Sequence, residues 1–143
     1  MSGTVVPSVY LDACCLIYLV EGEPAWKRAV EQTLHALGAA GSAGFISSEL
    51  SRLECRTTPL RDRNRVLLSR YDELLDAERL QLLAVSRAVI DQATELRARY
   101  GLKAPDSIHV ATAIVAGADV FLTGDGALAR CSEIRVQVLA AAP

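Results

Sequence analysis

Two aspartates stand after short apolar segments that have the composition of buried β-strands. Asp12 directly follows residues 9–11, and Asp125 follows residues 120–123 with one glycine between. In an open α/β sheet, ligands bind beyond the carboxyl ends of the strands, where these side chains would lie. Each aspartate also has a structural explanation, since Asp is a preferred helix N-cap and is common in glycine-containing turns. Neither residue alone decides between the two interpretations.

Two further acids stand at positions that direct a carboxylate toward the protein interior. Glu54 shares one predicted helix face with Leu50, Leu53 and Thr57, because these residues are three or four positions apart. A buried carboxylate is costly unless a cation or hydrogen bonds compensate it, or unless its end reaches water at the rim. Asp106 opens an apolar helix predicted at 106–116 and lies on its inward face, although a favourable interaction with the helix dipole also explains it.

Four carboxylates gathered in one place would repel one another and take up protons unless cations lay between them. Mg²⁺ and Mn²⁺ prefer such oxygen ligands, and two ions about 4 Å apart can activate a water molecule and stabilise the leaving oxygen of a phosphodiester. The sequence contains no competing nucleophile motif, because neither histidine stands near a Ser or Cys in a recognisable pattern. His109, one turn after Asp106, is expected to be a hydrogen-bonded core residue.

The elements that must position these acids alternate between short strands and longer helices. Strands are predicted at 9–11, 45–46, 80–85, 120–123 and 134–138. Helices are predicted at 13–20, at 24–37 before a loose stretch at 39–44, from 49 to a stop before Pro59, at 62–76, from a Ser86 cap to Gly101, and at 106–116. This alternation predicts an α/β fold of three layers, α/β/α, in which the central layer is a mostly parallel sheet.

The composition is that of one globular domain spanning residues 1–143. Apolar residues make up 51% and charged residues 22% of the chain, which excludes a disordered protein. A net charge of −2 gives no broad basic surface, so a polyanion would need a local patch or metal ions. The sequence has no apolar stretch long enough for a membrane span, no secretory signal, and no disulfide or zinc spacing among its four cysteines. We therefore expect a reduced, cytoplasmic protein that does not associate with membranes.

Four blocks of the sequence, taken in order, resemble the acidic blocks of the PIN domain: residues 9–12, 47–54, 105–113 and 117–125. A chain with little outside these blocks resembles the VapC-type toxins of bacterial toxin–antitoxin pairs. The resemblance implies a Mg²⁺- or Mn²⁺-dependent endoribonuclease that acts on RNA through a metal-activated water. It also implies a homodimer inhibited by a cognate antitoxin protein. On this resemblance the metal-site and catalytic acids are Asp12, Glu54, Asp106 and Asp125, and the Thr123 hydroxyl orients Asp125.

The sequence departs from the family pattern beside two of these acids. A hydroxyl residue often follows the first Asp in the family, whereas Ala13 and Cys14 stand here. Gly124 stands where the family often has Asn. These differences concern the hydrogen bonds around the site rather than the four acids themselves.

Arginine is concentrated in the segment that contains Glu54. Residues 52–70 carry six arginines against only two acids, Glu54 and Asp62. The planar guanidinium suits bidentate contacts with phosphate. We therefore expect RNA contacts on this segment, with a solvated helix surface or an antitoxin contact as alternatives; the candidates are Arg52, Arg56, Arg61 and Arg63.

Two other classes of function remain open at this point. One is a non-catalytic PIN-like module that binds RNA or protein, which the departures at Ala13 and Cys14 would permit. The other is a phosphatase with Asp12 as nucleophile, but the sequence lacks a second Asp two positions on. The metal-dependent nuclease is the interpretation that uses all four acids.

Overall fold

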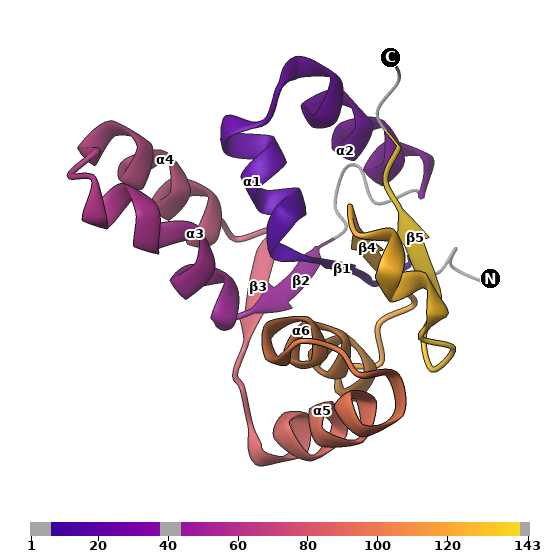
Figure 1. Ribbon diagram of the computed structural model, residues 1–143. Helices are drawn as coiled ribbons and strands as arrows, with labels where there is room; N and C mark the ends of the chain where they lie inside the picture. The colour runs from indigo at the N-terminus through magenta and orange to yellow at the C-terminus, as the bar shows by residue number, and fades with distance from the viewer. Residues whose placement is uncertain (1–6, 38–43, 141–143) are drawn as a thin grey trace.

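The computed structural model describes residues 7–37 and 44–140, and it contains one central β-sheet between two layers of helices (Figure 1). All strand pairings in the sheet are parallel, and the order across it is β3-β2-β1-β4-β5. The strands are β1 (Val9–Leu11), β2 (Phe45–Ser48), β3 (Leu80–Leu83), β4 (Val120–Thr123) and β5 (Val136–Val138). The predicted α/β class and three-layer arrangement are confirmed.

Six α-helices and one 3-10 helix connect the strands within the described residues. They are α1 (Ala13–Glu21), α2 (Pro24–Ala36), α3 (Leu50–Arg61), α4 (Arg65–Leu75), α5 (Arg87–Tyr100), α6 (Ala104–Val115) and the 3-10 helix η1 (Gly126–Arg130). None of the helices in the described part of the chain has the length and apolar character that a membrane span requires. The loose stretch expected at 39–44 lies outside the described residues except for Gly44.

The order of the strands creates a crevice at the carboxyl ends of β1 and β4. From β1 the chain moves outward to β2 and β3, and it then returns to the other side of β1 as β4. The connections after β1 and β4 therefore leave in opposite directions, which opens the space where ligands bind in doubly wound sheets. Asp12 and Asp125 both follow strands that border this crevice.

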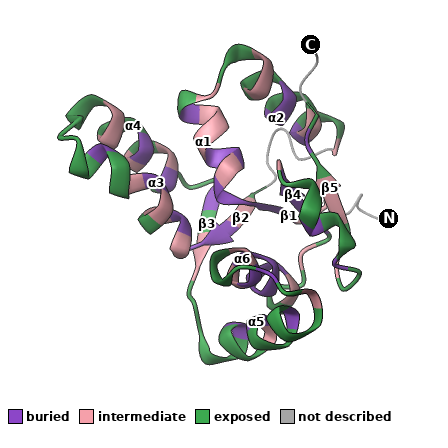
Figure 2. Cartoon of the chain, viewed as in Figure 1, coloured by how far each residue is buried: buried purple, intermediate pink, exposed green. Residues whose placement is uncertain are grey.

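The alternation of side chains along β1 divides the core into two parts. Val9 and Leu11 belong to a cluster that includes residues of α1, α2, α3 and α4, whereas Tyr10 belongs to a cluster with α5 and α6. Figure 2 shows the buried residues concentrated on the sheet and on the helix surfaces that face it. Because all three residues are at most 1% exposed, the start of the chain's first strand is fixed from both faces.

Several helix ends agree with the sequence signals that predicted them. The Ser86 hydroxyl accepts a hydrogen bond from the Val89 amide at the start of α5, and Gly101 ends this helix with a left-handed φ of 70°. Pro24 opens α2, where its missing N–H is not needed. These predicted helix limits are confirmed, because each depends only on residues that are neighbours in the sequence.

The hairpin formed by α3 and α4 differs from the prediction. The expected stop before Pro59 is wrong, because α3 continues to Arg61 with the Pro59 side chain buried, and this packing offsets the lost backbone hydrogen bond. Helix α4 begins at Arg65 and not at residue 62. Its start is fixed by Asn64, whose side chain accepts from the Leu67 amide, and by Arg63, whose φ of 55° is incompatible with a right-handed helix.

Four other boundaries shift by two residues. β2 ends at Ser48 and not at residue 46, so this strand is longer than predicted. β3 ends at Leu83 and β5 begins at Val136, so both strands are shorter than predicted. Helix α6 begins at Ala104, which places Asp106 within its first turn. Pro105 fits this turn because its fixed φ is already helical and its lack of an N–H costs nothing there.

Candidate active site

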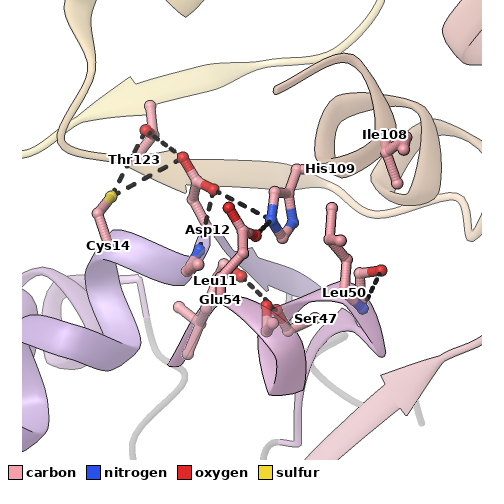
Figure 3. A network of polar contacts seen from close by, with 12 residues as sticks. Leu11, Asp12, Cys14, Ser47, Leu50, Glu54, Ile108, His109 and Thr123 are labelled. Atoms are coloured by element: carbon pink, nitrogen blue, oxygen red, sulfur yellow. Dashed lines mark hydrogen bonds and ion pairs between the residues drawn. The ribbon is translucent and has the colours of Figure 1, made fainter. Parts of the chain in front are cut away.

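Asp12 lies at the end of β1 and is both the N-cap of α1 and part of a buried polar network (Figure 3). Its Oδ1 accepts a hydrogen bond from the Ala13 amide at 2.9 Å, and its Oδ2 accepts one from the Thr123 hydroxyl at 2.7 Å. The residue is 7% exposed. The capping role and the predicted site role therefore coexist in one carboxylate whose orientation is fixed from two sides.

Thr123 connects the ends of β1 and β4. Its hydroxyl donates to the carboxylate of Asp12 and accepts a hydrogen bond from the main-chain N–H of Asp125 at 3.1 Å. The resemblance assigned this hydroxyl to the orientation of Asp125, but the carboxylate it contacts is that of Asp12. The Asp125 side chain is exposed and caps η1 by accepting from the Ala127 amide at 2.9 Å. Thr123 therefore fixes the first acid directly and the last one only through its backbone.

Glu54 reaches the crevice from α3 and contacts His109 of α6. The Oε1 atom of Glu54 lies 2.5 Å from Nε2 of His109, and the same nitrogen lies 3.8 Å from Oδ1 of Asp12. The second imidazole nitrogen, Nδ1, lies 2.6 Å from the Tyr10 hydroxyl. The prediction that His109 is a hydrogen-bonded core residue is confirmed, but it also contacts two of the four predicted acids. Its position one turn from Asp106 was the sequence signal that could have indicated this.

The helix face predicted to carry Glu54 is not the face that α3 buries. Leu53 is 63% exposed, and the buried residues of α3 are Ser51, Cys55 and Pro59. The helix packs its small side chains toward the sheet because Ser51 approaches β2 closely. The Ser47 hydroxyl donates to the Leu11 carbonyl at 2.7 Å and lies 2.8 Å from the Ser51 hydroxyl.

Glu54 therefore stands at the border of the buried face. Its side chain is 29% exposed, so the carboxylate is in contact with both the crevice and the solvent. The serine pair at the start of α3 fixes the helix against the end of β1. This attachment explains how an acid from a separate helix comes close to Asp12.

Asp106 lies in the first turn of α6, where the negative charges of the other three acids affect its pKa. Burial is the largest cause of its raised pKa, followed by the charges of Asp12 and Asp125. His109 acts in the opposite direction, and Glu54 raises this pKa further. The charges of all three other predicted acids therefore contribute to the protonation equilibrium of Asp106.

The charge of the site also acts on His109. Burial alone would lower the pKa of this imidazole, since it is 1% exposed. The hydrogen bond with Glu54 and the charge of Asp12 more than compensate, so the pKa is raised above its ordinary value. A cationic ring is thus favoured by the same negative potential that would attract a metal ion.

The thiol of Cys14 occupies part of the space beside Asp12. Its Sγ lies 3.8 Å from Oδ2 of Asp12 and 3.8 Å from the Thr123 hydroxyl, and it accepts a hydrogen bond from the Gly124 amide at 3.2 Å. A weak donor and acceptor therefore stands near the first acid, where the family often has a hydroxyl. The first departure is a change of donor rather than an apolar gap.

Gly124 lies directly against the side chain of Tyr18. A Cβ atom at this position would lie 2.9 Å from the Tyr18 hydroxyl oxygen, and the ring of Tyr18 is stacked on Trp26 with centroids 4.9 Å apart. An Asn in place of Gly124 would have to displace this aromatic pair. The glycine at position 124, where the family often has Asn, thus leaves room for the side chain of Tyr18 from α1.

The predicted RNA-contacting arginines fall into two groups. Arg52 and Arg56 of α3 form ion pairs with acids of the other arm of the hairpin, at 3.3 Å to Asp76 and 2.7 Å to Asp72. At the hairpin tip, Arg61 pairs with its neighbour Asp62 at 3.1 Å. Arg63 is exposed and has no ion-pair partner in the part of the chain that the structure describes.

Asp119 lies apart from the acid group. Its Oδ2 accepts a hydrogen bond from the Ser8 amide at 2.7 Å, at the beginning of β4. Asp119 therefore belongs to the entrance of β4 and not to the crevice. The carboxylate joins the amino ends of two adjacent strands, opposite to the end where the crevice lies.

The chemistry of the acid group fits a hard divalent cation. All four side chains offer carboxylate oxygens, which Mg²⁺ and Mn²⁺ prefer, and burial together with the charges of Asp12 and Asp125 raises the pKa of Asp106. Residues 7–37 and 44–140 contain no group of three or more His, Cys, Asp and Glu side chains that is already arranged to hold a metal ion. The four carboxylates are therefore the right type of ligand for Mg²⁺ or Mn²⁺. In this structure, Asp12 and Glu54 form hydrogen bonds with other protein groups.

The chain belongs to the PIN domain family, whose model matches residues 9–134. No curated protein sequence gives a significant match to the chain. Among solved structures, the chain is similar to one of VapBC2 from Rickettsia felis, bound to a DNA fragment from their promoter. The TM-score is 0.75 at 16% identity, over 92% of this chain and 98% of that one.

Two further solved structures share the fold. The Mycobacterium tuberculosis protein VapC20, a toxin that cleaves the sarcin-ricin loop, gives a TM-score of 0.69 at 17% identity, over 90% of this chain and 99% of that one. A toxin–antitoxin complex from Klebsiella pneumoniae gives a TM-score of 0.63 at 23% identity, over 89% of this chain and 95% of that one. The fold of the whole described chain is therefore that of these proteins.

Proposed function

We propose that this protein is a metal-dependent endoribonuclease, the toxin of a type II toxin–antitoxin pair, formed by one domain spanning residues 1–143. The proposal rests on the carboxylates of Asp12 and Glu54, which both approach Nε2 of His109 at the β1–β4 crevice. Asp106 lies one turn before His109 on α6, and Asp125 follows β4 at the same end of the sheet. Membership in the PIN domain family supports a nuclease, and the VapBC complexes that share the fold support a toxin.

Asp12, Glu54, Asp106 and Asp125 would hold Mg²⁺ or Mn²⁺. When bound, such a cation lowers the pKa of a water molecule and stabilises negative charge on a phosphodiester. The protein's own contribution is to place the oxygen ligands. The Thr123 hydroxyl and the Ala13 amide fix the carboxylate of Asp12, while His109 contacts that of Glu54.

The proposed products are RNA ends with a 5′-phosphate and a 3′-hydroxyl. Water, rather than the ribose 2′-hydroxyl, is the nucleophile in this reaction. The crevice offers carboxylates and one buried imidazole, and His109 is only 1% exposed, which leaves it unsuited to abstract a proton from the RNA. A 2′,3′-cyclic phosphate end would contradict this assignment, because only attack by the 2′-hydroxyl forms it.

The proposed partners are RNA, an antitoxin protein and a second copy of the chain. An apolar cavity of about 190 Å³ lies between α1, α2, α4 and β3, and it suits an apolar segment of an antitoxin. Exposed apolar side chains on the α3–α4 hairpin, Leu53, Leu60 and Val66, suit a protein interface. We place the protein in the cytoplasm, where its four free cysteines would stay reduced.

The test is end-mapping of total cellular RNA treated with the purified protein in Mg²⁺, Mn²⁺ or EDTA. We expect discrete cuts that need the metal and disappear in Asp12→Asn and Asp106→Asn proteins. Asp91→Asn is the matched control, because Asp91 is an exposed acid on α5 and the same charge is removed.

Other outcomes of this test favour the other classes of function. An absence of cuts from folded protein that is free of antitoxin would favour a non-catalytic binding module. Covalent trapping of a phosphate analogue on Asp12 would favour a phosphatase. Total RNA is the appropriate substrate, because a selective toxin can ignore a generic oligonucleotide.

A further inference from the structure

Three side chains form a continuous line of close polar contacts from the buried sheet to the acid group. The Tyr10 hydroxyl lies 2.6 Å from Nδ1 of His109, and Nε2 of His109 lies 2.5 Å from Oε1 of Glu54. Tyr10 is 0% and His109 1% exposed, so neither can exchange its partner for water. Figure 3 shows the imidazole directed at the carboxylates of Asp12 and Glu54. Both ring nitrogens are thus satisfied by protein atoms alone.

The direction of the hydrogen bonds along this line follows from the chemistry of its ends. An ionised carboxylate can only accept, so Nε2 of His109 carries a hydrogen and donates it to Glu54. In the neutral ring, Nδ1 then accepts from the Tyr10 hydroxyl. A phenol hydroxyl carries its hydrogen at neutral pH and can donate it to this nitrogen. In the cationic ring, Nε2 still donates to Glu54.

The imidazole is also fixed by the aromatic rings around it. The ring of Tyr10 packs edge-on against His109 with centroids 5.9 Å apart, and its other side is stacked on Phe121 at 5.2 Å. Tyr10 and Phe121 are register partners on adjacent strands β1 and β4. The orientation of the His109 ring is therefore set by the two strands that border the crevice.

Glu54 needs such a partner because its carboxylate stands among like charges at the edge of the solvent. Within the described residues its side chain hydrogen-bonds to His109, and it is 29% exposed. The Asp12 carboxylate approaches the same His109 nitrogen at 3.8 Å, so the negative charges of Asp12 and Asp106 repel the carboxylate of Glu54. Without the N–H of His109, the side chain would gain water and rotamer freedom by turning away from the crevice.

We infer that His109, supported by Tyr10, is a positioning residue that holds the carboxylate of Glu54 beside Asp12 and so completes the acid group. This inference rests on the proposed function, since it concerns how the chain presents its ligands to a divalent cation. The imidazole acts through Glu54 and does not itself contact the RNA. Loss of such a supporting hydrogen bond reduces metal affinity about 10- to 100-fold in other metal sites.

The test compares Mn²⁺ affinity, measured by calorimetry, in His109→Leu, His109→Gln and Tyr10→Phe proteins. We expect His109→Leu to weaken Mn²⁺ binding about 10- to 100-fold. His109→Gln should keep most of the affinity, because its amide N–H can still donate to Glu54. Tyr10→Phe removes only the support of the ring and should have an effect between these two.

Two matched controls separate this role from a general loss of side chains. His35→Gln changes the only other histidine of the sequence, which is exposed on α2, and Tyr100→Phe removes a phenol hydroxyl whose partners are Ser132 and Glu133. Both should bind Mn²⁺ as the wild type does. A merely structural role of His109 would lower the melting temperature of the leucine and glutamine variants and leave their Mn²⁺ affinities equal.

A second measurement does not require the metal. In the metal-free wild type, nitrogen NMR should show a protonated Nε2 on His109 whose hydrogen is protected from solvent exchange, and an unprotonated Nε2 would overturn the inference. A wild type that binds no Mn²⁺ would instead refute the proposed function. If the wild type binds Mn²⁺ and the leucine variant binds it equally well, the positioning role fails while the proposed function stands.

Discussion

The β1–β4 crevice and the α3–α4 hairpin both carry charged side chains, but they hold them in different ways. In the crevice, Asp12 and His109 are buried and each contacts two or more protein groups. On the hairpin, Arg52 and Arg61 form single ion pairs in which at least one partner is more than half exposed. Buried polar groups have to be satisfied by the protein, whereas exposed ion pairs compete with water and contribute little. The charged side chains of the crevice therefore have fixed orientations, whereas the arginines of the hairpin can change theirs.

The largest effect is expected for Asp12→Asn, which separates the two roles of this residue. Asn is as good an N-cap as Asp, so the melting temperature should change little. RNA cleavage should fall by more than about 100-fold, beyond the loss typical of a supporting residue. Thermal denaturation and the rate of cleavage, measured on the same preparation, check both parts. A variant that cleaves RNA at the wild-type rate would show that the first acid is only a cap.

Thr123→Val is expected to have the next largest effect. The substitution keeps the shape of the side chain but leaves Oδ2 of Asp12 without its hydroxyl donor in a fully buried position. Stability should fall by about 1–3 kcal/mol, and metal affinity by about 10- to 100-fold. Denaturant unfolding and Mn²⁺ calorimetry measure the two quantities. Thr94→Val, at an exposed threonine of α5, is the control and should change neither; equal effects of both substitutions would refute the special role of Thr123.

Gly124→Asn tests whether the crevice accepts the residue common in the family. The new side chain has to displace Tyr18 from its stack on Trp26, which should cost about 1–3 kcal/mol of stability. Tyr18→Ala should lower stability by itself but should remove most of the additional cost of the asparagine in the double variant. A double-mutant cycle by chemical denaturation measures this coupling. Additive effects would show that Tyr18 does not determine the glycine.

The smallest effects are expected for the arginines of the α3–α4 hairpin. Arg63→Gln removes a charge that no acid of the described residues neutralises, so the slope of log binding constant against log salt for single-stranded RNA should decrease by about 0.7. Arg56→Gln removes a charge that Asp72 already neutralises, so it should change this slope less. Filter binding over a series of salt concentrations checks both. A larger change for Arg56 than for Arg63 would mean that RNA displaces Asp72 from its ion pair.

Most of the fold was predictable from the sequence because its signals are local. The apolar segments indicated all five strands, and the cap at Ser86 and the glycine at 101 indicated the limits of α5. Pro59 misled the prediction because tertiary burial outweighed its preference to end a helix. The Arg63 turn could not be foreseen, since a left-handed arginine has no distinctive sequence signal.

The candidate site was predictable as a set of acids but not as a network. Strand ends and helix starts placed Asp12, Asp106 and Asp125 near one another. The contacts of His109 with Tyr10 and Glu54 join residues from a strand and two different helices, so they depend on the packing of the whole domain. The contact between Tyr18 and Gly124 likewise joins residues far apart in the sequence, so it could not be predicted from local signals.

The most direct test of the account is a crystal structure of the wild-type protein grown with Mn²⁺, with anomalous scattering recorded at the manganese edge. We expect an anomalous peak in the crevice, in contact with carboxylate oxygens of Asp12 and Asp106, and its loss in crystals of Asp106→Asn. A crevice without a peak at saturating Mn²⁺ would contradict the claim that these four acids form a metal site.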